Sequence, residues 1–314
     1  MIQKAILITT TTKAVQTAKP VGVIEKVKTP PVDTSAVVPA TSPFLIKTRS
    51  PEDKNKFLRI LVHGDSGTGK TWFAGTMIQA GLKTIYIVFE EDELLTLDKA
   101  GIYGYDYRVI TRYDQLWRLY LELRKNDKKW EGLILDSLTY LQQNAKDFEL
   151  GSETDKDFLR EAMLGNRRMY LQNWGNLLEM TRHFIVPVLK LPMHKIFTCV
   201  SEPDEDPKTG KSKIYPALQG SMQQLIDAYF SVVAYSFVYF YGPETHFCLT
   251  TQPHECVATK DRTGLCRVQI NPKFQNFLDS LNGKPSKASM VESAIQRSLI
   301  LRPQASTPKV EEKK

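Results

Sequence analysis

The segment from residue 64 to 71 reads G-D-S-G-T-G-K-T and has the residue types that bind phosphate. Its glycines permit a tight backbone whose N–H groups point inward, and the positive end of a following helix also attracts anions. Lys70 is expected to contact the β- and γ-phosphates of a nucleotide, and the Thr71 hydroxyl to bind Mg²⁺. The predicted nucleotide-binding residues are Gly64, Asp65, Ser66, Gly67, Thr68, Gly69, Lys70, Thr71 and Trp72.

The elements on either side of this loop decide how the motif is interpreted. The apolar run at 57–62 is typical of a buried parallel strand, and the amphipathic run at 70–80 is typical of a helix. A glycine-rich turn that matches by chance is the alternative, but it would not require a strand before it and a helix after it. We therefore expect a nucleoside triphosphate site at the junction of this strand and this helix.

Acidic residues follow two further apolar runs. Asp136 comes directly after residues 132–135, where it would bind Mg²⁺ opposite Thr71, because this ion prefers oxygen ligands. Glu90 and Glu91 follow the strand-like run at 84–89, where a carboxylate can position and polarise an attacking water. The alternatives are a helix cap at Asp136 and a solvated, charged turn at 90–93.

Strand-like and helix-like runs alternate along the middle of the chain. The predicted strands lie at 57–62, 84–89, 132–135 and 195–200. The predicted helices lie at 70–80, 113–126 and 167–189, the last kinked near Pro187. After Pro216, a helix at 222–228 is followed by strand-like runs at 231–240, 246–251 and 255–259. We expect an α/β fold with a mostly parallel central sheet, helices on both faces and an antiparallel C-terminal extension.

The net charge of +7 comes from the two ends of the chain. Residues 57–283 hold 28 acidic and 26 basic residues, so the middle of the chain has no excess of positive charge. Residues 1–54 are rich in Thr, Pro and Lys and are predicted to form a disordered basic tail. A folded domain is predicted at 55–283, followed by a flexible basic tail at 284–314. Within that tail, residues 289–300 have helical spacing, which fits either a short helix or a transient one.

A core without net positive charge offers no extended track for nucleic acid, so any contact would depend on the tails or on local clusters. The candidate clusters are Arg124 and Lys125 with Lys128 and Lys129, Arg167 with Arg168, and Lys208, Lys211 and Lys213. For each cluster, solvated surface charge is the alternative interpretation.

Cysteine usage bears on the compartment and on metal binding. The cysteines at 199, 248, 256 and 266 include no C-x-x-C pair, which indicates a reducing cytoplasm. No stretch approaches about 18 apolar residues, so no membrane span is predicted. His246, Cys248, His254 and Cys256 form two i, i+2 pairs across a predicted hairpin turn, and zinc accepts such ligands. The alternative is that they are packing residues, because this spacing fits no common zinc signature.

Taken in order, these features resemble the RecA-like P-loop ATPases of phages, AAA-like nucleotide-binding proteins of the single-strand-annealing and recombination type. The resemblance is carried by the loop, the acidic end of the second strand, L-D-S at 135–137, P-A-L-Q-G at 216–220 and T-K-D-R at 259–262. It covers about residues 55–280 and omits both tails. It implies an Mg-dependent ATPase, a homo-oligomer in the form of a ring or filament, and a cytoplasmic location, which is the host cytoplasm if a phage encodes the chain.

The resemblance also implies roles for individual residues. Glu91 is the implied catalytic carboxylate, with Glu90 as a close second, and Lys70 takes part in catalysis as well as binding. Lys260 and Arg262 match a K-x-R pair that reaches the γ-phosphate of a neighbouring subunit, where a cation stabilises transition-state charge. Without an oligomer, these two residues are surface cations on either side of Asp261.

Three functions remain open. The first is hydrolysis of Mg-ATP by an oligomer that acts on single-stranded DNA in phage-type recombination or replication. The second is a nucleotide-dependent assembly or binding protein with slow hydrolysis and no direct role on DNA. The third is a small-molecule or nucleoside kinase, which should have a lid with several arginines that the candidate lid lacks. A guanine-specific N-K-x-D element is missing, because Thr259-Lys260-Asp261 has no residue between the lysine and the aspartate.

Overall fold

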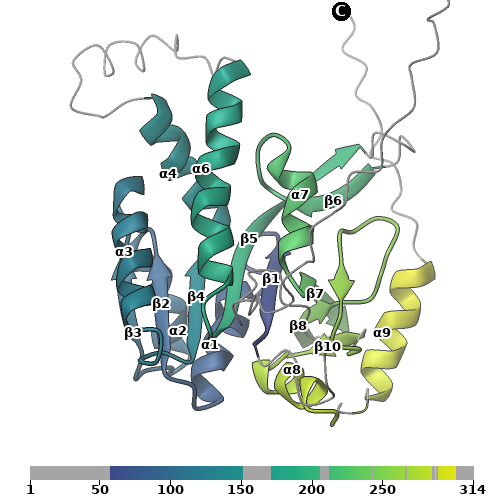
Figure 1. Ribbon diagram of the computed structural model, residues 1–314. Coiled ribbons are helices and arrows are strands. Elements are labelled where there is room, and N and C mark those ends of the chain that lie inside the picture. Colours follow the sequence, from purple (N-terminus) through teal and green to yellow (C-terminus); the bar gives the residue numbers. More distant parts are fainter. Residues whose placement is uncertain are drawn as a thin grey trace, which may run out of the picture. The chain divides into compact units, whose positions relative to one another are not determined.

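The computed structural model describes residues 57–150, 171–205, 212–241, 244–265, 267–284, 287 and 289–301. These residues form a ten-stranded sheet with helices on both of its faces (Figure 1). The predicted tail at 1–54 and much of the tail at 284–314 lie outside the described residues. The domain limits of 55–283 therefore stay a prediction.

Six neighbouring strands of the sheet run parallel, in the order β7-β1-β5-β4-β2-β3. They are β1 (Arg59–Gly64), β2 (Thr84–Val88), β3 (Asp106–Val109), β4 (Gly132–Asp136), β5 (His194–Glu205) and β7 (Val232–Tyr241). Antiparallel strands β8 (Glu244–Thr250) and β10 (Val268–Ile270) extend the sheet beyond β7. The expected mostly parallel sheet with an antiparallel C-terminal extension is confirmed.

Two short strands pair antiparallel at other places. The outer half of β5 pairs with β6 (Ser212–Pro216), and the start of β7 pairs with β9 (Lys260–Asp261). β5 is thus longer than the predicted strand at 195–200, because its outer half leaves the central sheet to form a ribbon with β6.

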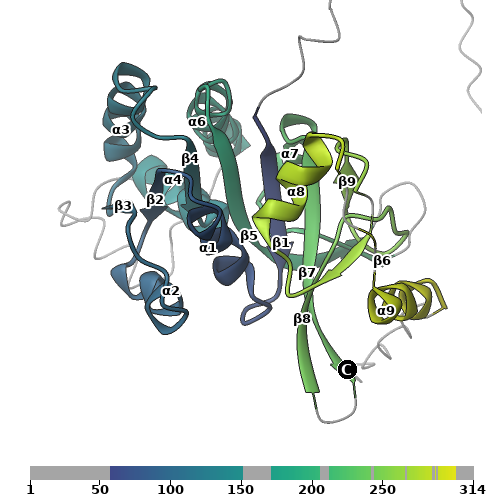
Figure 2. The same ribbon diagram turned by 90° about the horizontal axis from the view of Figure 1, so that it is seen from below.

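Helices cover both faces of the sheet, as predicted. One face carries α3 (Tyr113–Lys125), α4 (Leu138–Leu150), α6 (Leu171–Leu189) and α7 (Met222–Tyr229). The other carries α1 (Lys70–Gln79), α2 (Leu95–Lys99) and α8 (Phe274–Leu281), whose buried residues share one core cluster. Figure 2 shows α1 and α2 on the side of the sheet away from α3 and α6. A single 3-10 turn, η1 (Glu91–Leu94), precedes α2. The predicted first residues of the helix at 167–189 lie outside the described residues, and Pro187 lies inside α6.

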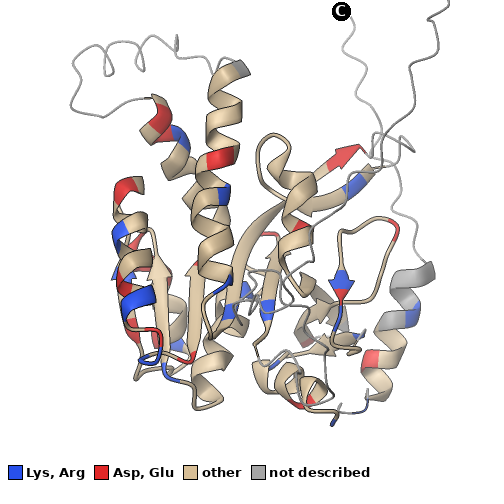
Figure 3. Cartoon of the chain, in the orientation of Figure 1, with Lys and Arg blue, Asp and Glu red and all other residues tan. Residues whose placement is uncertain are grey.

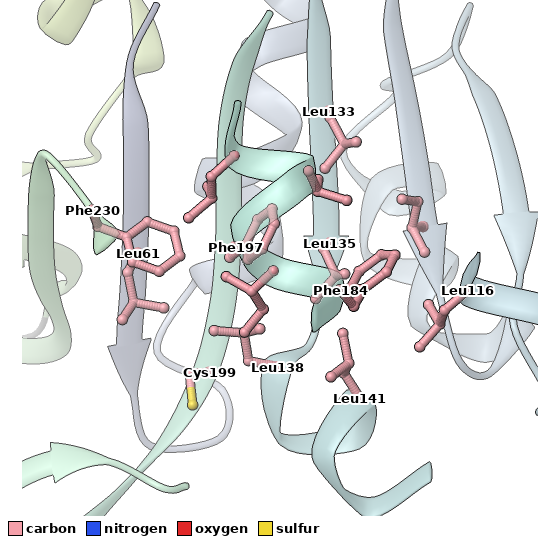
Figure 4. Close-up of a cluster of buried hydrophobic side chains, with 14 of the residues drawn as sticks. Leu61, Leu116, Leu133, Leu135, Leu138, Leu141, Phe184, Phe197, Cys199 and Phe230 are labelled. Atoms are coloured by element: carbon pink, nitrogen blue, oxygen red, sulfur yellow. The ribbon is translucent and has the colours of Figure 1, made fainter. Parts of the chain in front are cut away.

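Strand residues alternate between the two cores, because successive side chains on a strand point to opposite faces. Leu61, Leu133 and Phe197 enter the core under α4 and α6, which Figure 4 shows in close-up. Ile60 and Val62 enter the opposite core, where they share a cluster with Phe73 of α1. The strands are buried on both faces and run side by side in parallel. The loops after β1, β2 and β4 therefore lie together at the carboxyl ends of these strands.

The prediction of a strand at 255–259 is wrong. This segment instead closes on β6 through its backbone: Ile214 N donates to Cys256 O, and Ala258 N donates to Ile214 O. The next strand along the chain, β9, pairs with the start of β7 and not with β8. Seven further strands and α-helices of the described residues were not predicted from the sequence: β3, β6, β9, β10, α2, α4 and α8.

At the C-terminal side, the spacing at 289–300 corresponds to α9 (Met290–Leu301). Its Ile295 is buried against Cys248 of β8 and Val268 of β10. Across the described stretches of the chain, no helix has both the length and the apolar character that crossing a membrane requires.

Candidate functional site

The loop at 64–71 connects the end of β1 to the first turn of α1, as the sequence predicts. Gly67 and Gly69 have φ angles of 76° and 89°, a left-handed conformation that favours glycine. Phe73 N donates to Gly69 O at 2.9 Å, which begins the helical hydrogen bonding. The Thr68 hydroxyl donates to Asp65 O at 2.8 Å and closes the loop on itself.

Strand β7 holds the loop from outside the motif. The Ser236 hydroxyl donates to Thr68 O at 2.7 Å. A Cβ atom at Gly64 would lie 2.2 Å from Ser236 O, so a residue with a side chain does not fit where β1 meets β7. The first glycine of the motif is therefore required by packing against a strand far away in the sequence.

The Lys70 ammonium lies inside the loop. Its Nζ atom donates to Gly64 O at 2.8 Å and to Asp65 O at 2.7 Å. Burial lowers the pKa of Lys70, and the negative charge of Asp136 acts in the opposite direction. The cation is thus placed at the centre of the loop, where the oxygens of a bound phosphate can replace the two carbonyl oxygens.

Asp136, at the end of β4, is buried and accepts hydrogen bonds from three hydroxyls. Thr71 of α1 donates to its Oδ2 atom at 2.7 Å, and Tyr86 of β2 donates to the same oxygen at 2.8 Å. Thr198 of β5 donates to Oδ1. The peptide bond between Asp136 and Ser137 is cis. A carboxylate and a hydroxyl held together beside a phosphate loop are oxygen ligands of the kind that Mg²⁺ takes.

The acidic run after β2 divides into two directions. The Glu91 carboxylate accepts a hydrogen bond from Tyr107 of β3 at 3.2 Å, so it faces the edge strand. Glu93 accepts from Phe89 N at 3.1 Å, and burial, together with the charges of Asp136 and Glu90, raises the pKa of Glu93 to about 7. The Glu93 carboxylate therefore lies within electrostatic range of Asp136, whereas the Glu91 carboxylate faces β3.

Tyr140, in the first turn of α4, marks the same side. Burial, followed by the charges of Glu90, Glu93 and Asp136, raises the pKa of Tyr140. Its ring lies 6.4 Å from that of Phe89, measured between ring centroids. Tyr140 thus lies within electrostatic range of three carboxylates, those of Glu90, Glu93 and Asp136.

Lys260 and Arg262 lie at the opposite end of the strands from the loop. Val233 of β7 pairs with Lys260, whereas Ser236 pairs with Gly64 at the loop end of β1. The Lys260 ammonium donates to Asp227 O at 2.6 Å, and Arg262 N donates to Ser231 O at 3.0 Å. Within one chain these cations do not reach the loop, so a contact with nucleotide requires a second copy.

The zinc interpretation finds no support in the geometry. The described residues, which include His246, Cys248, His254 and Cys256, contain no group of three or more His, Cys, Asp or Glu side chains arranged to hold a metal ion. Cys248 is buried and packs against Ile295 of α9, as expected for a packing residue. Cys256 N donates to the Nδ1 atom of His254 at 3.1 Å.

His63, next to the loop, is a structural residue that the sequence analysis missed. Its Nε2 atom lies 2.6 Å from Ala258 O, which can only accept, so Nε2 carries the proton. Its Nδ1 atom then accepts from the Ser201 hydroxyl at 2.8 Å. Burial lowers the pKa of His63 to about 4. The neutral ring joins the end of β1 to β5 and to the segment after β8.

Tyr86 and Thr198 are the other residues that sequence analysis missed. Both are buried polar side chains within apolar strands, in T-I-Y-I-V and K-I-F-T-C-V. A buried polar group requires a hydrogen-bond partner, so each one signalled an unidentified partner. That the partner is Asp136 depends on the strand order, which brings β2 and β5 to either side of β4.

The raised pKa of Glu93 predicts how stability depends on pH. An unfolded Glu releases its proton near pH 4.5, whereas Glu93 in the folded protein keeps it to about pH 7. The folded state therefore binds more protons in this window, and this residue's contribution to the free energy of unfolding falls as pH rises from about 4.5 to about 7.

Glu93→Gln keeps the acceptor for Phe89 N and removes the charge. Without nucleotide, we expect it to be more stable than wild type at pH 8 by about 1 kcal/mol, after allowance for solvent screening, and equal to it near pH 4.5. Thermal unfolding across this pH range measures the difference. A stability difference that does not change with pH would contradict the assignment.

Comparison with known proteins gives a family. Among solved structures, the chain is similar to the flagellar accessory protein FlaH from Methanocaldococcus jannaschii, with 15% sequence identity and a TM-score of 0.32. That alignment covers 62% of this chain and 78% of FlaH. No curated protein matches the chain. Residues 56–263, more than half of the chain, match the protein family described as "AAA domain". The chain therefore belongs to the AAA domain family.

Proposed function

We propose that this protein binds Mg-ATP in the loop at 64–71 and hydrolyses it. The observation that carries the proposal is the hydrogen bond of 2.7 Å between Thr71 and Asp136. It joins the end of the phosphate loop, next to the Lys70 ammonium, to the end of β4. We propose these two side chains as the magnesium ligands. Membership of the AAA domain family supports nucleotide binding by this loop.

Each residue of the loop has a separate task in this account. The backbone N–H groups of 64–71 and the first turn of α1 hold the phosphate oxygens, and Lys70 leaves Gly64 O and Asp65 O to bind the β- and γ-phosphates. Mg²⁺, when bound by Thr71 and Asp136, neutralises charge on the phosphate oxygens. Tyr86 and Thr198 keep the Asp136 carboxylate oriented when the Thr71 hydroxyl turns to the metal.

The carboxylate that positions the attacking water comes from the turn after β2. Glu91, implied by the family resemblance, bonds to Tyr107 on the edge strand. Glu90 is exposed, and its charge raises the pKa values of Glu93 and Tyr140, the same two groups whose pKa values Asp136 raises. This geometry favours Glu90 over Glu91 as the catalytic carboxylate, since general-base catalysis requires the carboxylate to reach the water beside the γ-phosphate.

Three variants in one assay separate phosphate binding from catalysis. Lys70→Ala should lose ATP hydrolysis and weaken ATP binding, because it removes the cation within the loop. Glu90→Gln should bind ATP as wild type does and lose turnover by about 100-fold, a typical contribution of a positioned base. Glu91→Gln, its matched control, should lose far less.

Steady-state hydrolysis and ATP titration measure both quantities. Full turnover by Lys70→Ala would contradict the phosphate-binding role of the loop. A larger loss of turnover in Glu91→Gln than in Glu90→Gln would contradict the placement of the catalytic carboxylate and restore Glu91 to that role.

The partners of the ATPase follow from two further features. We propose that Lys260 and Arg262, which lie far from the loop of their own chain, act on the nucleotide of a second copy in a ring or filament.

We also propose single-stranded DNA as the polymer on which the ATPase acts, a proposal that rests on the family resemblance alone. Of the candidate basic clusters, Lys129 is paired with Asp106 at 3.0 Å, and acidic residues are interspersed with basic ones along α3 (Figure 3). Residues 167, 168, 208 and 211 lie outside the described residues.

One titration tests both partners. The hydrolysis rate per chain should rise with protein concentration, since the cations act between copies. Single-stranded DNA should stimulate the rate, and the stimulation should fade as salt rises, because binding to phosphates releases counterions. A rate per chain that is independent of concentration would contradict the oligomer. A rate unaffected by DNA at low salt would favour the alternative, an assembly protein with slow hydrolysis and no direct role on DNA.

A further inference from the structure

The ribbon formed by β7 and β8 runs past the phosphate loop. β1 ends at Gly64, which pairs with Ser236, and β7 continues to Tyr241 with β8 antiparallel beside it. Figure 2 shows the two strands extending beyond the body of the sheet. The part of the ribbon that passes the loop therefore lies next to any ligand bound there.

One face of this ribbon is turned toward the loop. Ser236 points to the loop, since its hydroxyl donates to Thr68 O at 2.7 Å. Alternate residues of a strand share a face, and directly paired residues of neighbouring strands share it too. Val238 is therefore on the loop-facing side, and Phe247, which pairs with Val238, is on that side as well.

The Phe247 ring lies directly against the loop backbone. A Cβ atom placed on Gly69 would be 3.1 Å from the Cδ1 atom of Phe247 and 3.2 Å from its Cγ atom. The ring thus lies against the glycine that precedes Lys70. Asn271 N donates to Phe247 O at 2.8 Å and fixes the strand at this point. Even so, 38% of Phe247 is exposed, so part of the ring is open to a ligand.

The direction of a bound nucleotide follows from the position of Asp136. In the proposed site, the β- and γ-phosphates would lie at the Lys70 and Asp136 end. The strand that carries Asp136, β4, lies on one side of β1, beyond β5. The phosphates, ribose and base of a nucleotide are joined in that order, so a base whose γ-phosphate lies beside Asp136 would lie on the side of the loop away from Asp136. On the other side of β1 lie β7 and β8, and therefore Phe247.

We propose that Phe247 forms one wall of the nucleobase site and stacks on the base of the bound nucleotide. The inference rests on the proposed ATP site at 64–71 and adds a binding residue from outside the phosphate motif. Stacking on an aromatic ring is tolerant of base identity, because every base has a π-face. Phe247 therefore contributes affinity for a nucleobase without distinguishing adenine from guanine.

The test compares a ligand that has a base with one that lacks it. For Phe247→Ala, the dissociation constant for Mg-ATP should rise about tenfold, as expected for the loss of one stacked base, and GTP should be affected by a similar factor. The dissociation constant for Mg-tripolyphosphate should stay within about twofold of wild type, because the phosphate loop is unchanged. Phe247→Trp keeps an aromatic ring at this position and should therefore bind ATP as the wild type does.

Two further variants control for damage to the ribbon. Phe247→Leu keeps an apolar side chain on Gly69 without a ring, and it should fold as wild type does and still lose ATP affinity. Phe240→Ala removes a ring that is 71% exposed from the same ribbon, farther from the loop, and should leave ATP affinity unchanged.

Unchanged ATP affinity in Phe247→Ala and Phe247→Leu would overturn the proposal. An equal loss of ATP and tripolyphosphate binding would also overturn it, since the ring would then support the loop and not the base. Equal losses in Phe240→Ala and Phe247→Ala would overturn it by indicating general damage to the ribbon. The proposed ATP site is tested separately. Wild-type ATP affinity in Lys70→Ala would contradict that site, whatever the Phe247 variants show.

Discussion

The site depends on one set of interactions, the hydrogen bonds that three hydroxyls donate to the buried Asp136 carboxylate. A buried charge of this kind is costly unless hydrogen bonds replace its water. Thr71, Tyr86 and Thr198 supply these bonds from α1, β2 and β5, so one side chain on β4 ties four elements together. The register of the sheet and the orientation of the first turn of α1 are therefore fixed at the same point. That point is the one where a metal ion would be held.

The same constraint organises the charges around the site. The charge of Asp136 acts on both Lys70 and Glu93, and burial together with Asp136 raises the pKa of Glu93 to about 7. The arrangement leaves more negative charge at the end of β2 and β4 than one lysine neutralises. A divalent cation at Thr71 and Asp136 would relieve this repulsion. In the proposed function, the metal-bound form of the nucleotide would therefore suit this site better than the metal-free form.

The sequence allowed the local features to be predicted and left the long-range ones open. The phosphate loop, its flanking strand and helix, and Asp136 at a strand end follow from patterns within a few residues, and the parallel sheet follows from the alternation of elements. The helix α4 was within reach as well, because its buried residues Leu138, Leu141, Gln142 and Ala145 have helical spacing. The prediction of a strand at 255–259 was wrong because the backbone of this segment bonds to Ile214 of β6. No local pattern in the sequence reveals this partner.

The partners of the predicted residues could not be derived from a single sequence. Tyr86 and Thr198 reach Asp136 only because the strand order places β2 and β5 on either side of β4, and Phe247 reaches the phosphate loop only because β8 pairs with β7. Within the acidic run, adjacent residues are equivalent in the sequence, and only the turn geometry separates Glu91, which faces Tyr107, from Glu90. Lys260 and Arg262 matched a motif, but their distance from the loop of the same chain depends on the pairing of β9 with β7.

The most direct test of the account is the effect of Mg²⁺ on ATP affinity in wild type and in Asp136→Asn. Calorimetric titration with ATP, in Mg²⁺ and in EDTA, gives the four dissociation constants. If Asp136 holds the metal, Mg²⁺ should tighten ATP binding to the wild type, and the asparagine variant should lose this gain by about tenfold or more. The variant should bind metal-free ATP at least as tightly as the wild type does, because it has lost a negative charge beside the phosphates. An equal gain from Mg²⁺ in both proteins would contradict the central role of Asp136.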